Sequence, residues 1–184
     1  IPEYSEGNSR RDITCISEDL DGNIWLGTTA GLFVVKDNFS QQILVGDSRT
    51  DIKIKSLFHD GINQMWVGTN EGLRRYDGAV FSTYSLRELS AKKTTAIIED
   101  DQNRIWVGTT SGIRILREDG IQETDMLAEL PGEPIEYLFQ SRGEGTWIGT
   151  PLGVYQYHNG KLKNFLKISF AQDGKPETDN QSPV

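Results

Sequence analysis

The sequence predicts an all-β protein built of β-propeller blades, because one short segment recurs in it four times at a nearly constant interval. The four tryptophans are 41, 40 and 41 residues apart, and a glycine follows each of them six residues later. A fixed period of about 40 residues is typical of an array of identical supersecondary units. The repeated residues of the four units are Trp25, Gly27, Thr28 and Gly31; Trp66, Gly68, Thr69 and Gly72; Trp106, Gly108, Thr109 and Gly112; and Trp147, Gly149, Thr150 and Gly153.

Each unit is expected to begin with a short buried strand followed by a tight polar turn. β-branched and aromatic residues gather upstream of each tryptophan, which favours a strand there. These segments are residues 13–17, 54–58, 94–98 and 135–139. Three residues before the tryptophans stand Gly22, Asn63, Asn103 and Glu144. Glycine and asparagine accept a left-handed backbone, so the first three turns suit a hairpin. In the fourth, Gly143 and Gly145 flank Glu144 and are expected to take over this role.

The tryptophan strand comes next, and two further strands complete each unit. The third strands are expected at residues 32–35, 73–76, 113–116 and 154–157, and the more polar fourth strands at 40–44, 80–85, 121–124 and 162–166. Four antiparallel strands joined by sequential hairpins make one propeller blade. The indole is expected to pack between successive sheets, where its loss would cost about 3–5 kcal/mol. The Gly-Thr pair after it would let two backbones approach closely, and the threonine hydroxyl would bind a turn amide.

The repeated frame resembles the two-component-regulator propeller repeat. It reads Asp-x-x-(Gly/Asn)-x-(Ile/Met)-Trp-(Leu/Val/Ile)-Gly-Thr-x-x-Gly-(Leu/Ile/Val), and the resemblance covers residues 12 to about 168. The fourth unit departs from the frame, with Ser141 in place of the turn aspartate, Thr146 before the tryptophan and Pro151 in the next loop. The resemblance implies a periplasmic or extracellular propeller in a bacterial sensor protein that also carries a histidine kinase or a diguanylate cyclase. Many such sensors detect polysaccharide fragments.

The chain is expected to be an arc of a larger propeller, because four blades are fewer than the closed propellers of that family contain. The expected division is an outer strand of a preceding blade or a linker at 1–11, blades at 12–51, 52–91, 92–132 and 133–171, and a linker or disordered tail at 172–184. The start at Ile1 fits an excised or processed piece. An open arc leaves sheet faces uncovered, so we expect self-association or packing against further blades of the same protein.

Composition argues against several classes of partner. The net charge is −8 and lysine and arginine are scattered, so no basic patch exists that would bind nucleic acid or an anionic membrane surface. The longest apolar runs are a few residues, well short of the roughly 20 that a membrane helix needs. Cys15 is the single cysteine and cannot form a disulfide within the chain.

No catalytic, metal or cofactor site is expected, because a catalytic residue should break the repeat and none does. His59 aligns with polar residues of the other units, His158 falls in a solvated turn, and Cys15 lies inside the first strand. The turns are too short for calcium and lack a closing glutamate, so their carboxylates are expected to hydrogen-bond the turn instead. The turn aspartates are Asp19, Asp60 and Asp100.

A ligand is expected at the rim where the loops differ between units. The loops that join second to third strands, and those that join successive units, should lie at the same end of the blades and vary in residue type, as binding loops do. Their polar character suits a hydrated small ligand such as an oligosaccharide. The candidate residues are Thr29, Asn70, Glu71, Thr110, Ser111 and Arg49.

The sequence therefore favours a non-catalytic, extracytoplasmic sensor segment that binds a small ligand. Two alternatives stay open. A propeller enzyme of the streptogramin-lyase type would need a histidine essential for turnover, and a protein-interaction scaffold would bind a folded partner and no small molecule. Similarity of fold alone does not choose among the three.

Overall fold

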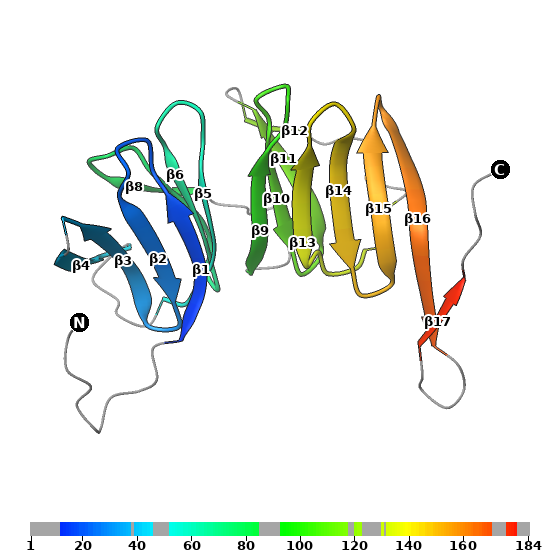
Figure 1. The fold of residues 1–184 in the computed structure, drawn as a ribbon, viewed down its shortest axis with the longest axis horizontal. Helices are drawn as coiled ribbons and strands as arrows, with labels where there is room; N and C mark the ends of the chain where they lie inside the picture. The colour runs from blue at the N-terminus through cyan, green and yellow to red at the C-terminus, as the bar shows by residue number, and fades with distance from the viewer. Residues whose placement is uncertain are drawn as a thin grey trace.

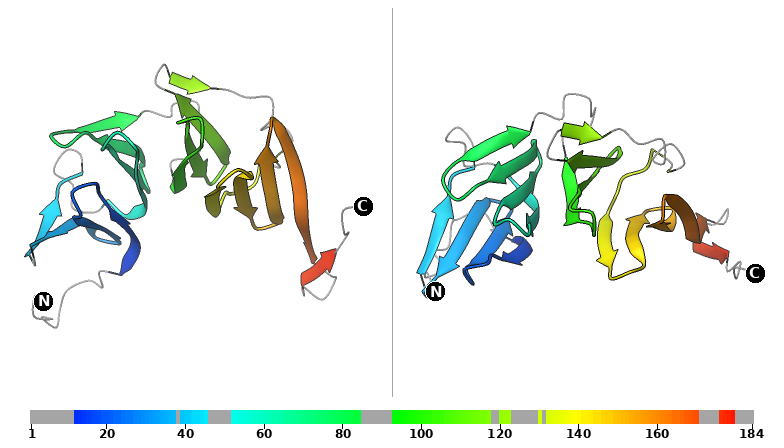
Figure 2. Two further views of the ribbon diagram at one scale, coloured as in Figure 1. Left: turned by 45° about the horizontal axis from the view of Figure 1, so that its top comes forward. Right: turned by 90° about the horizontal axis from the view of Figure 1, so that it is seen from above.

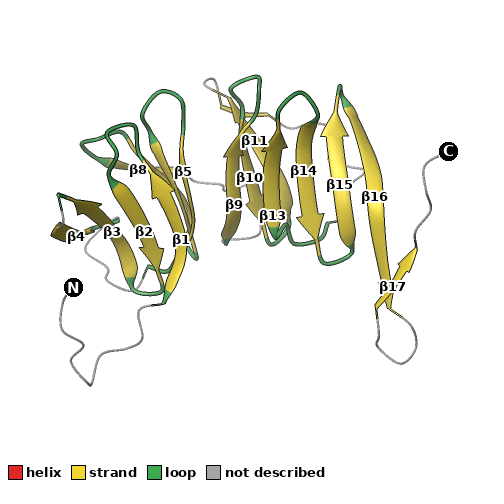
Figure 3. Ribbon diagram, viewed as in Figure 1, coloured by secondary structure: helices red, strands yellow, loops and turns green. Residues whose placement is uncertain are grey.

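The computed structural model describes residues 12–37, 39–45, 52–84, 93–117, 120–122, 130, 132–170 and 176–179. In this part of the chain all regular structure is β: Figure 3 shows strands joined by loops and turns, and no helix. None of the described segments forms a helix long and apolar enough to cross a membrane. The predicted all-β class is confirmed.

Four antiparallel sheets follow one another along the chain, and we number them blades 1 to 4 (Figure 1). Blade 1 contains β1 (Ile13–Glu18), β2 (Ile24–Thr28), β3 (Gly31–Lys36) and β4 (Phe39–Ile43). Blade 2 contains β5 (Ile54–His59), β6 (Met65–Thr69), β7 (Gly72–Tyr76) and β8 (Phe81–Tyr84). Blade 3 contains β9 (Thr94–Glu99), β10 (Ile105–Thr109), β11 (Gly112–Arg117) and β12 (Gly120–Gln122). Blade 4 contains β13 (Tyr137–Ser141), β14 (Gly145–Thr150), β15 (Gly153–His158), β16 (Lys161–Phe170) and β17 (Pro176–Asp179).

The strands of each blade pair in chain order, as sequential hairpins require. The first strands β1, β5, β9 and β13 contact one another from blade to blade, whereas the outer strands fan apart (Figure 2). The blades therefore stack as a curved array with the first strands on its inner side. This is the arrangement predicted from the period of the tryptophans.

The core lies in the three interfaces between neighbouring blades. Trp25, Trp66 and Trp106 each belong to a separate cluster of buried residues that joins its blade to the next one. The prediction that the indoles pack between sheets is confirmed for these three. Trp147 occupies the same place in blade 4, but there its ring is half-buried and packs on Phe165 of its own sheet, with ring centroids 4.8 Å apart.

In blades 1 to 3, the glycine two residues after the tryptophan makes room for a side chain of the next blade. A Cβ added to Gly27 would lie 2.6 Å from Cγ2 of Ile54, and one added to Gly68 would lie 2.7 Å from Cγ2 of Thr94. At Gly108 the corresponding distance, to Cγ2 of Ile135, is 2.8 Å. Real Cβ atoms do not approach this closely, so these three glycines accommodate side chains of the next blade, whereas the sequence predicted a close approach of two backbones.

The threonine that follows this glycine closes the next hairpin in every blade. In blade 1 the Thr28 hydroxyl donates to the Gly31 carbonyl at 2.8 Å and accepts from the Ala30 amide at 3.0 Å. The same pair of bonds forms at the equivalent threonines. Gly31, the second repeat glycine of blade 1, has a φ of 123°, a left-handed value that residues other than glycine rarely adopt.

The first hairpin turn also has the predicted backbone. Gly22, Asn63 and Asn103 have φ values of 79°, 67° and 56°. In blade 4 the left-handed residues are Gly143 and Gly145, at 77° and 84°, so the flanking glycines do replace Glu144.

Blade 4 differs from expectation in its outermost part. β17 lies inside the segment 172–184, which the sequence predicts to be a linker or disordered tail, and for residues 176–179 that prediction is wrong. β16 is ten residues long, so its far end offers unpaired backbone groups, and β17 pairs with it antiparallel from Lys167 to Phe170. Residues 1–11 and the remainder of 172–184 lie outside the described residues.

Candidate functional site

Two cavities lie between neighbouring blades, at the rim formed by the turns after the first and third strands. Groove 1, between blades 1 and 2, has a volume of about 580 Å³, and groove 2, between blades 2 and 3, about 470 Å³. The two are equivalent by repeat position. Each is lined by the turn aspartate and tryptophan of one blade and the turn asparagine of the next: Asp19, Trp25 and Asn63 in groove 1, and Asp60, Trp66 and Asn103 in groove 2.

The turn aspartate fixes one end of each groove. Oδ1 of Asp60 accepts from the amides of Ile62 and Gln64, at 3.1 and 2.8 Å, and Oδ2 accepts from Nε1 of Trp66 at 2.8 Å. Asp19 and Asp100 accept from their own tryptophans at 2.8 and 2.7 Å. The predicted hydrogen-bonding role of these carboxylates is confirmed. Within the described ranges, no three metal-ligating side chains come together.

Asp19 is held in its ionised form by this arrangement. Burial raises the pKa of the carboxyl, but the hydrogen bonds from Trp25, from the Asn23 side chain and from the amides of Asn23 and Asp21 together outweigh it, so the pKa lies below its ordinary value of 3.8. Its oxygens already accept bonds from the protein, so Asp19 shapes groove 1 without being its most available ligand group.

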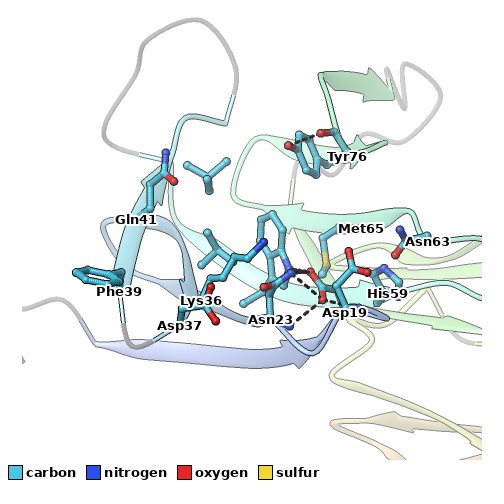
Figure 4. A pocket seen from close by; sticks show the side chains of 15 residues that line it. Asp19, Asn23, Lys36, Asp37, Phe39, Gln41, His59, Asn63, Met65 and Tyr76 are labelled. Atoms are coloured by element: carbon cyan, nitrogen blue, oxygen red, sulfur yellow. Dashed lines mark hydrogen bonds between the residues drawn. The ribbon is translucent and has the colours of Figure 1, made fainter.

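The walls of groove 1 combine an apolar floor with a polar margin (Figure 4). On the blade 1 side, Val34, Gln41 and Trp25 share one face of the sheet, because they stand opposite one another in the strand register. Phe39 lies two residues before Gln41 in β4 and therefore also faces the groove, yet it is 79% exposed. An aromatic ring in this position is a flat apolar surface open to solvent.

The blade 2 side of groove 1 is rigidly held. The ring of Tyr76 stacks on Phe81 with centroids 4.7 Å apart and lies 5.7 Å from that of Trp25. Its hydroxyl donates to the carbonyl of Gly78 at 2.8 Å. Met65 completes the apolar floor, being 2% exposed.

Polar groups of both signs surround this floor. Asp21 and Asp37 are exposed, and so is Lys36, the last residue of β3. His59 and Asn63 face them from blade 2 (Figure 4). The arrangement can place several donors and acceptors around a molecule whose apolar face rests on the aromatic wall.

In groove 2, two of the lining charged side chains, Glu99 and Arg75, already contact other groups of the protein. Oε2 of Glu99 accepts from the Gly61 amide at 3.1 Å, a bond that crosses from blade 3 to the turn of blade 2. The Arg75 guanidinium lies over the Trp66 ring, 5.7 Å from its centroid. The repeat equivalents of Gly61 and Glu99 are Leu20 in blade 1 and His59 in blade 2, and of these two only His59 lines groove 1. Groove 1 is therefore the better candidate for a ligand.

Five of the residues predicted from sequence lie at the opposite rim, in the turns after the second strands. There Oγ1 of Thr29 accepts from the Asp12 amide at 3.2 Å and Oδ1 of Asn70 from the Lys53 amide at 2.9 Å. Glu71 forms an ion pair with Arg74 at 3.9 Å. Thr110 and Ser111 occupy the same turn in blade 3, and Arg49 lies outside the described residues. These residues stand on three separate blades and line neither groove, and their part in ligand binding stays a prediction.

Sequence reasoning missed Phe39, although a signal for it exists. The equivalent positions in the other blades hold Val80, Gly120 and Lys161, so Phe39 is an exposed aromatic that the repeat does not require. The equivalents of His59 in the other units are polar residues, so the sequence predicts no function for it. In the structure His59 lines groove 1. The inter-blade spacing that places these two side chains in one groove is not visible in the repeat frame.

The other singled-out side chains lie apart from the grooves. His158 is exposed, and its Nε2 lies 2.8 Å from Nδ2 of the neighbouring Asn159. Cys15 is half-buried against Gly27, and burial raises the pKa of its thiol, so it is not poised as a nucleophile.

Comparisons with known proteins agree with the architecture. Residues 88–111 match the model of the family described as "Two component regulator propeller". The sequence matches no curated protein. In structure, the chain is similar to the extracellular domain of a putative hybrid two component system from B. thetaiotaomicron, with 19% identity and a TM-score of 0.72 over 88% of this chain and 25% of that one.

Two further structures are similar to the chain. The first is a catalytically inactive virginiamycin B lyase from Staphylococcus aureus in complex with quinupristin, with 12% identity, a TM-score of 0.71, and coverage of 96% of this chain and 73% of that one. The second is the extracellular domain of a putative one component system from B. thetaiotaomicron, with 18% identity, a TM-score of 0.55, and coverage of 95% and 32%. The chain thus spans about a quarter to a third of the two sensor domains. Residues 88–111 match the two-component regulator propeller model, and the chain shares a propeller fold with the extracellular domains of these bacterial sensor systems.

Proposed function

We propose that this chain is a ligand-binding segment of an extracytoplasmic bacterial sensor and that groove 1 takes an oligosaccharide. The observation that carries the proposal is the exposed ring of Phe39 beside a groove margin of mixed carboxylate, amide, imidazole and ammonium groups. A sugar ring has an apolar face and a polar circumference, so it matches a flat aromatic wall surrounded by hydrogen-bonding side chains. The likeness to sensor domains supports the location outside the cytoplasm.

In this proposal the segment performs no chemistry and reports occupancy to a signalling module elsewhere in the same protein. A ligand shifts a conformational equilibrium only by its difference in affinity for the two states. Groove 1 is formed by two blades, so a bound ligand stabilises one relative position of those blades. That position is the quantity that the rest of the protein would sense.

Isothermal titration of the chain with a panel of oligosaccharides tests the proposal. We expect saturable binding to at least one sugar and a loss of about 2- to 12-fold in affinity for Phe39→Ala, the range for a lost aromatic contact. Leu20→Ala is the matched control, because Leu20 is a similarly exposed apolar side chain at the same rim that does not line groove 1. Absence of binding to every sugar would overturn the oligosaccharide proposal.

The same titration separates the two rims. Asn70→Ala and Glu71→Ala change the rim predicted from sequence, whereas Phe39→Ala changes groove 1. If only the first two variants lose affinity, the ligand binds at the rim opposite groove 1, and the assignment to groove 1 is wrong.

One observation favours a second candidate, a propeller lyase. His59 lines groove 1, and the virginiamycin B lyase shares the fold. This candidate predicts turnover of quinupristin, the compound bound in that lyase structure, with complete loss in His59→Ala. Product analysis by mass spectrometry decides between the two, since a sensor leaves its ligand unchanged.

A further inference from the structure

A tryptophan and a turn aspartate form the same hydrogen-bonded pair in blades 1 to 3, and in two of these blades an arginine lies on the indole. The Arg75 guanidinium is 5.7 Å from the centroid of the Trp66 ring. In blade 3 the Arg104 guanidinium is also 5.7 Å from the Trp106 centroid, and its Nε donates to Oδ2 of Asp100 at 2.6 Å. The repeat therefore offers a place where a positive charge rests against an indole.

Blade 1 supplies no arginine at this place. The two positions that hold arginine in blades 2 and 3 are Val34 and Asn23 in blade 1. Val34 stands opposite Trp25 in the strand register, just as the blade 2 arginine stands opposite its tryptophan. The Asn23 side chain donates to Oδ2 of Asp19 at 2.8 Å, which satisfies the carboxylate but brings no positive charge. Among the residues that the structure describes, no cationic side chain lies on the Trp25 ring.

The space beside this indole is groove 1, and its margin carries an excess of negative charge (Figure 4). Three carboxylates line the groove, those of Asp19, Asp21 and Asp37, whereas Lys36 is the single lysine or arginine among the lining residues. Asp21 and Asp37 are exposed, and neither carboxylate has a hydrogen-bond or ion-pair partner in the described part of the chain. The groove therefore attracts a positively charged ligand and repels an acidic one.

We propose that the ligand of groove 1 carries a protonated amino group, which takes the place beside Trp25 that arginine fills in blades 2 and 3. This inference rests on the proposed function and narrows the oligosaccharide to one that contains amino sugars. The face of an indole attracts a cation through the ring quadrupole, and the carboxylates of the margin add to that attraction. An amino sugar offers an apolar ring face to Phe39 and an ammonium group to Trp25.

Isothermal titration with two sugars of the same shape tests the proposal. One is the tetramer of β-1,4-linked glucosamine, and the other is the tetramer of β-1,4-linked glucose, which has a hydroxyl in place of each amino group. Both are measured at pH 6, so the state of His59 is common to the two titrations. The glucosamine tetramer is expected to bind about 2- to 30-fold more tightly, the range for a cation on an indole. This preference is expected to shrink as salt rises from about 20 to about 500 mM.

Variants of Val34 test the place that the ammonium takes. Val34→Arg gives blade 1 the cation of blade 2 and is expected to abolish the preference for the glucosamine tetramer. Val34→Gln is the matched control, because it adds length without charge and Gln156 stands at the same position in blade 4. It is expected to keep the preference. Circular dichroism checks that both variants fold, and Asn23→Arg, which copies Arg104 of blade 3, makes the same test at the second arginine position.

Variants of the carboxylates test the charge of the margin. Asp37→Asn is expected to lower the preference by up to about 5-fold, as for an exposed ion pair. The backbone suits this change, because Asn159 has a φ of 50° at the equivalent position of blade 4 and Asp37 has one of 48°. Lys36→Gln removes the competing ammonium and is expected to raise the preference. Asp101→Asn is the control, since Asp101 is an exposed turn residue of blade 3 that lines neither groove.

The outcomes separate this proposal from the proposed function. Equal affinity for the two tetramers, or tighter binding of the glucose tetramer, would overturn the amino-sugar proposal and leave groove 1 as a site for neutral sugars. A preference that Val34→Arg and Asp37→Asn both leave unchanged would also overturn it, because the charge would then be recognised elsewhere. Absence of binding to every sugar would overturn the proposed function and this inference together.

Discussion

One carboxylate in each of the first three blades connects a turn to the core, and it is buried in blades 2 and 3 and partly exposed in blade 1. In blade 2 the Asp60 side chain accepts from two turn amides with one oxygen and from the Trp66 indole with the other. The indole N–H would otherwise be an unsatisfied donor inside the interface, which is costly. In blade 4, Ser141 has no second oxygen to offer, and Trp147 is the tryptophan that is left half-buried.

Asp19 contributes to the pH dependence of folding. Its pKa is lower in the folded chain than the ordinary 3.8, so its contribution to stability is present above pH 3.8 and is lost as the pH falls through the folded pKa. Asp19→Asn is expected to lower the unfolding free energy by about 1 kcal/mol at pH 7, and by progressively less below pH 3.8. Urea denaturation at pH 7 and pH 3 measures both values.

Asp21→Asn serves as the control for this prediction. Asp21 lies in the same turn but is exposed, so its replacement is expected to change stability by less than about 0.5 kcal/mol at either pH. An Asp19→Asn chain with unchanged stability at pH 7 would contradict the role assigned to the carboxylate.

At the scale of the strand, the glycine between tryptophan and threonine sets the spacing of neighbouring blades. Gly108→Ala would place its Cβ 2.8 Å from Cγ2 of Ile135, which forces the two sheets apart and is expected to cost about 1–3 kcal/mol. Gly149→Ala is the matched change in a blade with no such neighbour, and it is expected to be neutral or slightly stabilising. Urea midpoints of the two variants, measured at low protein concentration, test the difference; equal losses would contradict it.

The strands show how far the sequence alone determines the fold. The period located all four blades, and β14 and β15 were found in blade 4 although its frame is degraded. β13 begins at Tyr137, two residues later than expected, and the amide of Ile135 donates across to the Thr109 carbonyl of blade 3. β17 pairs with the part of β16 that extends beyond β15. The other three blades have no such fifth strand, so the repeat pattern does not predict it.

The candidate site was less accessible to sequence reasoning than the fold. Residues that vary between the four units mark positions that the repeated scaffold does not fix. Such positions include the loops that carry Asn70 and Glu71, and these loops do not line groove 1. Groove 1 arises because successive sheets diverge towards their outer strands, which brings Phe39 of blade 1 and His59 of blade 2 to one cavity. Such contacts depend on the angle between neighbouring sheets, and the repeat pattern in the sequence gives no information about that angle.

At the scale of the whole molecule, the central blades have neighbours on both sides and the end blades on one. Trp106 is 0% exposed in blade 3, whereas Trp147 is half-buried in blade 4. In a stacked array, stability is roughly the sum of unit and nearest-neighbour contributions. We expect amides of β6 and β10 to exchange with solvent about tenfold or more slowly than those of β2 and β14 in dilute solution.

Hydrogen exchange followed by mass spectrometry measures this gradient. If copies associate end to end, raising the protein concentration is expected to protect β2 and β14 selectively and to leave β6 and β10 nearly unchanged. Uniform protection along the chain at every concentration would contradict the description of the arc as a sum of neighbouring interfaces.

Each of the three described junctions places a β-branched side chain, isoleucine or threonine, in the gap beside a glycine, so the blades share one way of packing. Duplication or deletion of one 40-residue unit in the gene leaves two ends that still match, so descendants can differ in circumference by whole units without any new junction having to evolve.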